Sequence, residues 1–119
     1  MQCLQELNIT ENLQIMANTL HARSVDYLRK QGCVVATVES YNHFTKRKKD
    51  LFGVIDILAI GNNETLAVQV TSKSNMSSRI KKIEESEALP EMLRSGWRVI
   101  VHGWSKNTKN RFELKEFEF

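Results

Sequence analysis

The sequence predicts an α/β fold in which a mixed β-sheet is flanked by helices and extended by a strand at its C-terminal edge. Two observations predict it. Apolar residues recur at helical spacing in two segments, and five short segments are β-branched or alternate between apolar and polar residues. The chain has 119 residues, 41% hydrophobic and 26% charged, as expected for a single globular domain over residues 1–119.

The first predicted helix covers residues 11–31. Thr10 is a favourable N-cap, and the apolar stripe of the helix includes Leu20, Ser24 and Leu28. Gly32 should end this helix, because glycine readily adopts the left-handed conformation that follows many helices.

Three strands should follow, over residues 33–39, 53–60 and 65–71, with a polar and basic connection over 40–52. The sequence Gly61-Asn62-Asn63-Glu64 is a strong signal for a tight turn between the last two. These three strands can therefore form an antiparallel meander.

The second half of the chain predicts a helix over 77–88, a short helical turn from Pro90 to Gly96, and strands over 97–104 and 111–118. A helix between two strands of one sheet normally returns the second strand parallel to the first. We therefore expect the fourth strand to pair parallel with the third, and the last strand to lie at an edge.

The charge distribution is consistent with a polyanionic partner. The net charge is +3, and the basic residues include one block, Lys46-Arg47-Lys48-Lys49. A solvated loop is an equally good interpretation of this block. The sequence shows no secretory signal and no membrane span, and two cysteines without metal-type spacing favour an intracellular, cytoplasmic protein with reduced thiols.

Asp56 interrupts an otherwise apolar strand. If the hairpin turn is centred on Asn62-Asn63, Asp56 lies directly across from Gln69, with its side chain on the same face of the sheet. Alternation along the strand adds Thr71 and Lys73 to that face. A carboxylate and an amide oxygen at this separation can share a divalent cation such as Mg²⁺. The alternative is that Asp56 only hydrogen-bonds Gln69 and nearby backbone.

The combination DLFGVIDILAI, then LAVQVTS, resembles the core of PD-(D/E)XK nucleases, and in particular small phage and bacterial proteins related to Holliday-junction resolvases and VRR-type nucleases. The resemblance covers roughly residues 11 to 104. It implies a restriction-endonuclease-like αβββαβ core, with Asp56 as the metal-binding aspartate. Gln69 takes the position of the family's glutamate.

Two positions depart from the family pattern. Thr71 occupies the place of the catalytic lysine, so Lys73 and Lys82 are candidates to supply the ammonium. For the additional acidic residue that the family often carries, Glu39 is favoured, while Asp26 and Asp50 remain open.

The resemblance implies a DNA endonuclease dependent on Mg²⁺ or Mn²⁺, with branched DNA as a candidate substrate and a homodimer as the expected assembly. No organic cofactor is expected. The implied catalytic set is Asp56, Gln69, Thr71, Lys73 and Glu39; the implied metal ligands are Asp56, Gln69 and Glu39; the implied DNA contacts are Lys46, Arg47, Lys48, Lys49, Arg79 and Lys82.

Two alternatives stay open: a catalytically inactive DNA-binding module of the same fold, and a protein-interaction subunit. His21, His43 and His102 are dispersed and are expected to be surface or structural residues. Tyr41 and Phe44, in the basic connection, are expected to anchor that loop or to stack on bases.

Overall fold

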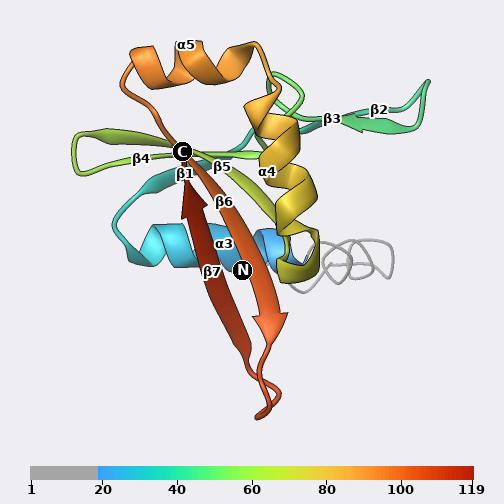
Figure 1. Cartoon of the computed structure of the whole chain (residues 1–119), viewed down its shortest axis with the longest axis vertical. Coiled ribbons are helices and arrows are strands. Elements are labelled where there is room, and N and C mark those ends of the chain that lie inside the picture. Colours follow the sequence, from blue (N-terminus) through green and yellow to red (C-terminus); the bar gives the residue numbers. More distant parts are fainter. Residues whose placement is uncertain (1–18) are drawn as a thin grey trace, which may run out of the picture.

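The computed structural model describes residues 19–119 and shows a mixed α/β fold with a five-stranded central sheet (Figure 1). The predicted α/β class is confirmed. Within these residues no helix is long and apolar enough to cross a membrane. The elements in chain order are α3 (Thr19–Lys30), β1 (Val34–Thr37), β2 (Ser40–Asn42), β3 (Arg47–Lys49), β4 (Ile57–Gly61), β5 (Glu64–Ser72), a 3-10 helix (Lys73–Asn75), α4 (Met76–Glu84), α5 (Ala88–Arg94), β6 (Arg98–Lys106) and β7 (Phe112–Glu118).

The central sheet has the strand order β1-β4-β5-β6-β7. β1, β4 and β5 form the predicted antiparallel meander, β6 pairs parallel with β5, and β7 adds an antiparallel edge strand. Asn62 and Asn63 have φ of 54° and 62°, which suits a two-residue hairpin turn of the left-handed type. The turn therefore sets the predicted register, in which Ile57 faces Val68.

The predicted strand over 53–60 begins only at Ile57. Phe52 and Gly53 have φ of 54° and 76°, and Leu51 pairs with Ile55 across the resulting tight turn. Because those two residues turn the chain, the apolar residues 53–55 are not strand, although Val54 and Ile55 are buried. The connection over 40–52 also contains a separate β2–β3 hairpin, which the sequence did not predict because its residues are polar, basic and exposed.

The two helical segments predicted in the second half of the chain are present with shifted ends. The helix expected over 77–88 is α4, which begins at Met76 and ends at Glu84. The helical turn expected from Pro90 to Gly96 is α5, and at its start the N–H of Ala88 donates to Ser86 Oγ. The first helix ends as predicted. Gly32 has φ of 92°, and the N–H of Cys33 donates to the carbonyl of Leu28. Residues 11–18 of that predicted helix lie outside the described residues.

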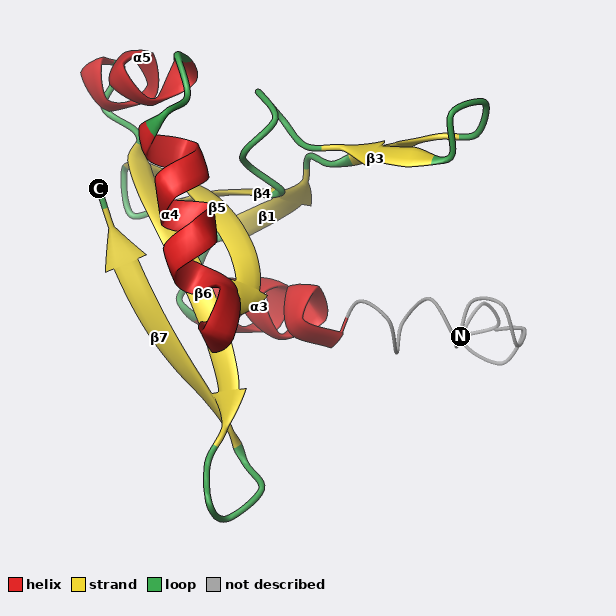
Figure 2. Cartoon of the chain, turned by 45° about the vertical axis from the view of Figure 1, so that its right-hand side comes forward, coloured by secondary structure: helices red, strands yellow, loops and turns green. Residues whose placement is uncertain are grey.

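The hydrophobic core lies in two layers, one on each side of the central sheet. Helix α3 packs on one side and α4 and α5 on the other, as the two views together show (Figures 1 and 2). Alternation along each strand divides the side chains between the layers. The buried residues on the α3 side are Leu28, Ile57, Ala59, Leu66, Val68 and Ile100; those on the other side are Val54, Ile55, Ala67, Met76, Ile83, Met92, Val99 and Val101.

A buried polar network joins α3 to β6 and β7. The indole N–H of Trp104 donates to Ser24 Oγ at 2.8 Å, and Ser24 Oγ lies 2.9 Å from His102 Nδ1. Because an indole can only donate, the Ser24 hydroxyl is left to donate to Nδ1. His102 Nε2 then faces a carboxylate oxygen of Glu116 at 3.3 Å, so both nitrogens of this fully buried ring have partners.

Candidate functional site

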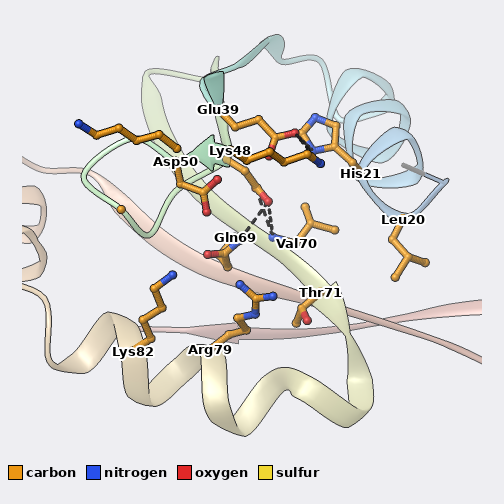
Figure 3. Close-up of a pocket in the computed structure, with 13 residues that line it drawn as sticks. Leu20, His21, Glu39, Lys48, Asp50, Gln69, Val70, Thr71, Arg79 and Lys82 are labelled. Atoms are coloured by element: carbon orange, nitrogen blue, oxygen red, sulfur yellow. Dashed lines mark hydrogen bonds and ion pairs between the residues drawn. The ribbon is translucent and has the colours of Figure 1, made fainter. Parts of the chain in front are cut away.

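A cavity of about 510 Å³ opens between the meander, α3, α4 and the base of the β2–β3 hairpin (Figure 3). The hairpin brings two acidic residues to it. Ser40 pairs with Lys49, so Glu39 and Asp50, which lie just outside that pair, leave the hairpin at its base. The cavity is lined by Leu20, His21, Glu39, Lys48, Lys49, Asp50, Gly53, Asp56, Gln69, Val70, Thr71, Arg79 and Lys82.

Asp56 and Gln69 lie side by side in this cavity, as their predicted register requires. Gln69 Nε2 donates to Asp56 Oδ2 at 3.0 Å, and the N–H of Val70 lies 3.3 Å from both carboxylate oxygens. The N–H of Asp56 donates to the Val68 carbonyl, which continues the β4–β5 ladder one residue beyond β4. The side chain of Asp56 is therefore held by the sheet itself and is 6% exposed.

Burial raises the pKa of Asp56 from 3.8 to about 7. The N–H of Val70 works against this shift by stabilising the carboxylate, while the nearby charges of Asp50 and Glu39 reinforce it. Near neutral pH the folded protein is therefore stabilised when this carboxyl group takes up a proton or binds a cation.

The amide oxygen of Gln69 is a second group in need of a partner. Gln69 is 2% exposed, and its Oε1 is the one buried side-chain nitrogen or oxygen among residues 20–119 without a hydrogen bond. An unsatisfied buried acceptor is costly, and such groups are rare in native proteins. Gln69 lines the cavity, so a cation bound there can satisfy this buried oxygen once the amide turns it toward the cation.

His21 and Glu39 add two more potential metal ligands next to Asp56. One ligand atom from each of His21, Glu39 and Asp56 lies within 4.8 Å of the others. His21 Nε2 lies 3.0 Å from the Thr37 hydroxyl; when it donates to that oxygen, the Nδ1 lone pair is free on the side of Glu39, 3.8 Å away. Burial lowers the pKa of His21, which favours the neutral imidazole that metals bind.

Two of the three candidate acidic residues lie at the cavity. Glu39 lines the cavity, and so does Asp50. Asp26 does not, since it is exposed on α3 and pairs with Lys30 at 3.0 Å. His21 was expected to be a surface or structural residue, and the structure instead puts it among these donors. Its one sequence signal is its position beside Leu20, at the edge of the buried stripe of the helix.

Four basic residues surround the acidic centre. Lys48 and Lys49 come from β3. Arg79 and Lys82, which are labelled in Figure 3, come from α4. Lys48 Nζ lies 4.0 Å from a carboxylate oxygen of Glu39. The centre thus offers oxygen and nitrogen donors to a cation, and its rim offers positive charge to an anion.

Three other predicted residues lie elsewhere. Lys46 and Arg47 are on the exposed hairpin, outside the lining of the cavity. Thr71 is buried in the cavity wall as expected, but Lys73 is exposed and also outside the lining. The placement of Lys73 on the cavity face is wrong because β5 ends at Ser72, and the alternation of its side chains ends with it.

No protein-family model, curated protein or solved structure matches this chain.

Proposed function

We propose that the protein is a divalent-metal-dependent DNA endonuclease of the PD-(D/E)XK class. The main observation behind this proposal is the pairing of Asp56 with Gln69 on adjacent strands. Glu39 and His21 lie beside this pair, and the cavity that contains them has a basic rim. A cluster of hard donors next to cationic side chains suits a bound metal together with a phosphodiester. When the β2–β3 hairpin and α5 are set aside, α3, the sheet strands β1, β4 and β5, helix α4 and strand β6 follow one another in the αβββαβ order, which supports the same proposal.

Asp56, Glu39 and the amide oxygen of Gln69 are the proposed ligands of Mg²⁺ or Mn²⁺, with His21 as a fourth donor. The raised pKa of Asp56 and the unpartnered Oε1 of Gln69 both support this donor set. When bound, the cation lowers the pKa of a coordinated water and offsets charge on the scissile phosphate.

Lys82 and Arg79 take over the role that a threonine at position 71 cannot perform. Both side chains approach the cavity from α4 and can stabilise charge that develops on the phosphate. Lys46, Arg47, Lys48 and Lys49 would contact flanking phosphates, so affinity for DNA should fall with salt concentration. A homodimer would place two such centres on two strands.

A catalytically inactive DNA-binding module is the second candidate function. It is favoured by the neutral side chains of Gln69 and Thr71, which give the centre less charge than the family pattern. Both candidates predict salt-sensitive DNA binding, so cleavage separates them.

The test is cleavage of labelled linear, flapped and four-way-junction DNA with Mn²⁺, Mg²⁺ or EDTA. We expect the wild type to cut only with metal, and Asp56→Asn to lose about a thousandfold or more in rate, because a negatively charged ligand is replaced by a neutral one. Asp26→Asn is the matched control, since it makes the same change on an exposed carboxylate. Salt-sensitive binding without cutting in the wild type would establish the inactive module instead.

If His21 is a ligand, the site should prefer Mn²⁺ to Mg²⁺. Imidazole is a good ligand for transition metals, whereas Mg²⁺ prefers oxygen donors. We expect His21→Ala to weaken Mn²⁺ binding about tenfold or more with little effect on Mg²⁺, measured by Mn²⁺ paramagnetic resonance and by competition with Mg²⁺. The control is His43→Ala, on the exposed hairpin. Unchanged Mn²⁺ binding in His21→Ala would remove this residue from the ligand set.

A further inference from the structure

We propose that the β2–β3 hairpin is a wedge for unpaired DNA bases, with Phe44 as the side chain on which a base stacks. The inference rests on the proposed function and specifies its substrate class, DNA that carries unpaired bases. The hairpin extends away from the body of the domain in both views (Figures 1 and 2).

The tip of the hairpin presents an aromatic ring almost entirely to solvent. Phe44 is 99% exposed, and Tyr41 is 51% exposed. Neither residue therefore anchors the loop, which was one of the two roles expected from the sequence. Asn42 Oδ1 accepts the N–H groups of Phe44 at 2.8 Å and Thr45 at 3.2 Å, so the backbone of the tip is held in a turn.

A hollow of about 390 Å³ lies beside this ring. It is lined by Ser40, Tyr41, Asn42, His43, Phe44 and Lys49. The rings of Tyr41 and His43 meet edge to face with their centroids 5.0 Å apart. Aromatic faces beside amide and hydroxyl groups can stack on a base and hydrogen-bond its edge.

The charge of the hairpin selects a nucleic acid as the occupant. Residues 40–49 contain Lys46, Arg47, Lys48 and Lys49 and no acidic residue. Alternating phosphates and flat bases match a surface of cations and exposed rings, as in proteins that bind single strands. Charge complementarity thus points to DNA rather than to an apolar peptide.

The hairpin is also continuous with the candidate site. Lys49 lines both the hollow and the cavity, and Glu39 and Asp50 lie at the two ends of the hairpin. A base stacked on Phe44 would therefore belong to the same DNA molecule that reaches Asp56. Because bases inside a duplex are already stacked, an unpaired base is accepted at lower cost. The hairpin should thus direct the cavity to forks or flaps.

The test is DNA binding in EDTA, where metal-dependent cutting does not intervene. Fluorescence anisotropy would compare a labelled duplex with a forked DNA of equal length. We expect the wild type to prefer the fork, and Phe44→Ala to weaken fork binding about 5- to 100-fold while changing duplex binding less than about twofold. Phe44→Trp should retain the preference because it keeps a ring at the tip.

Phe117→Ala is the matched control, since Phe117 is an exposed aromatic on β7, at the opposite edge of the central sheet from β1. It should change neither affinity. Equal loss on fork and duplex in Phe44→Ala, or no loss on either, would overturn the proposal. So would binding to phosphatidylserine vesicles that depends on Phe44 while fork binding does not.

Different results would contradict the wedge proposal and the nuclease proposal. Fork preference that depends on Phe44, in a protein that never cuts, supports the wedge and contradicts the nuclease. Metal-dependent cutting of forks with no effect of Phe44→Ala on binding or rate overturns the wedge and leaves the nuclease standing.

Discussion

Metal-free protein with Asp56→Asn is expected to be more stable than the wild type at pH 8, by about 1–3 kcal/mol of unfolding free energy. The reason is the burial of an ionised carboxylate beside Asp50 and Glu39, which raises the pKa of Asp56 to about 7. An asparagine keeps an oxygen that accepts the N–H of Val70 but carries no charge. The measurement is urea unfolding in EDTA.

The pH dependence of this gain has a defined sign. The folded-state pKa of Asp56 lies above its ordinary value of 3.8, so the folded protein binds the proton more readily than the unfolded chain. The stability linked to this proton is complete below about pH 4 and is lost as the pH rises through about 7. The advantage of Asp56→Asn should therefore shrink as the pH falls from 8 to 4.

In the presence of Mn²⁺ the wild type should become more stable than Asp56→Asn. A ligand that binds only the folded state adds about 4.1 kcal/mol of stability at a thousand times its dissociation constant, which exceeds the deficit of the metal-free wild type, and only the wild type keeps the carboxylate at position 56. Asp26→Asn, on an exposed carboxylate, should change the stability by less than about 0.5 kcal/mol under all these conditions. If metal-free Asp56→Asn is less stable than the wild type at pH 8, burial of the charged Asp56 carboxylate does not carry the free-energy cost assigned to it.

Replacing His102 by alanine is expected to cost about 3–4 kcal/mol of unfolding free energy. The ring is fully buried, so its loss leaves a cavity between α3, β6 and β7. It also removes the acceptor of the Ser24 hydroxyl, which Trp104 already holds in place. Urea unfolding measures the cost. Glu116→Gln, which changes the exposed partner of the same ring, should cost less than about 1 kcal/mol.

Acid should destabilise the protein through the same histidine. Burial lowers the pKa of His102, and Glu116 offsets this only in part. The unfolded chain therefore binds the proton more readily, and the stability held above about pH 6.5 is lost as the pH falls below it. The slope is best measured in Asp56→Asn, which lacks the opposing titration of Asp56. His21 contributes with the same sign, so His21→Ala is measured alongside. A slope unaffected by His102→Ala would contradict this assignment.

The sequence by itself determined the pairing of β4 with β5 and the Asp56–Gln69 contact. Both follow from local rules, because the Asn62-Asn63 turn sets the register and alternation places each side chain on a face. The same rules failed for Lys73, one residue beyond the end of β5, and for residues 53–55, where Phe52 and Gly53 turn the chain.

Only the tertiary structure decided which other residues meet Asp56. His21 comes from α3, Glu39 and Asp50 from the two ends of a hairpin, and Lys82 from α4, and no periodicity relates these positions in the chain. The docking of α3 and α4 on opposite faces brings them to one cavity, and that docking depends on buried apolar area rather than on local sequence. The exposed hairpin was missed for the converse reason: it contributes no side chain to either core layer, so it leaves no apolar pattern to read.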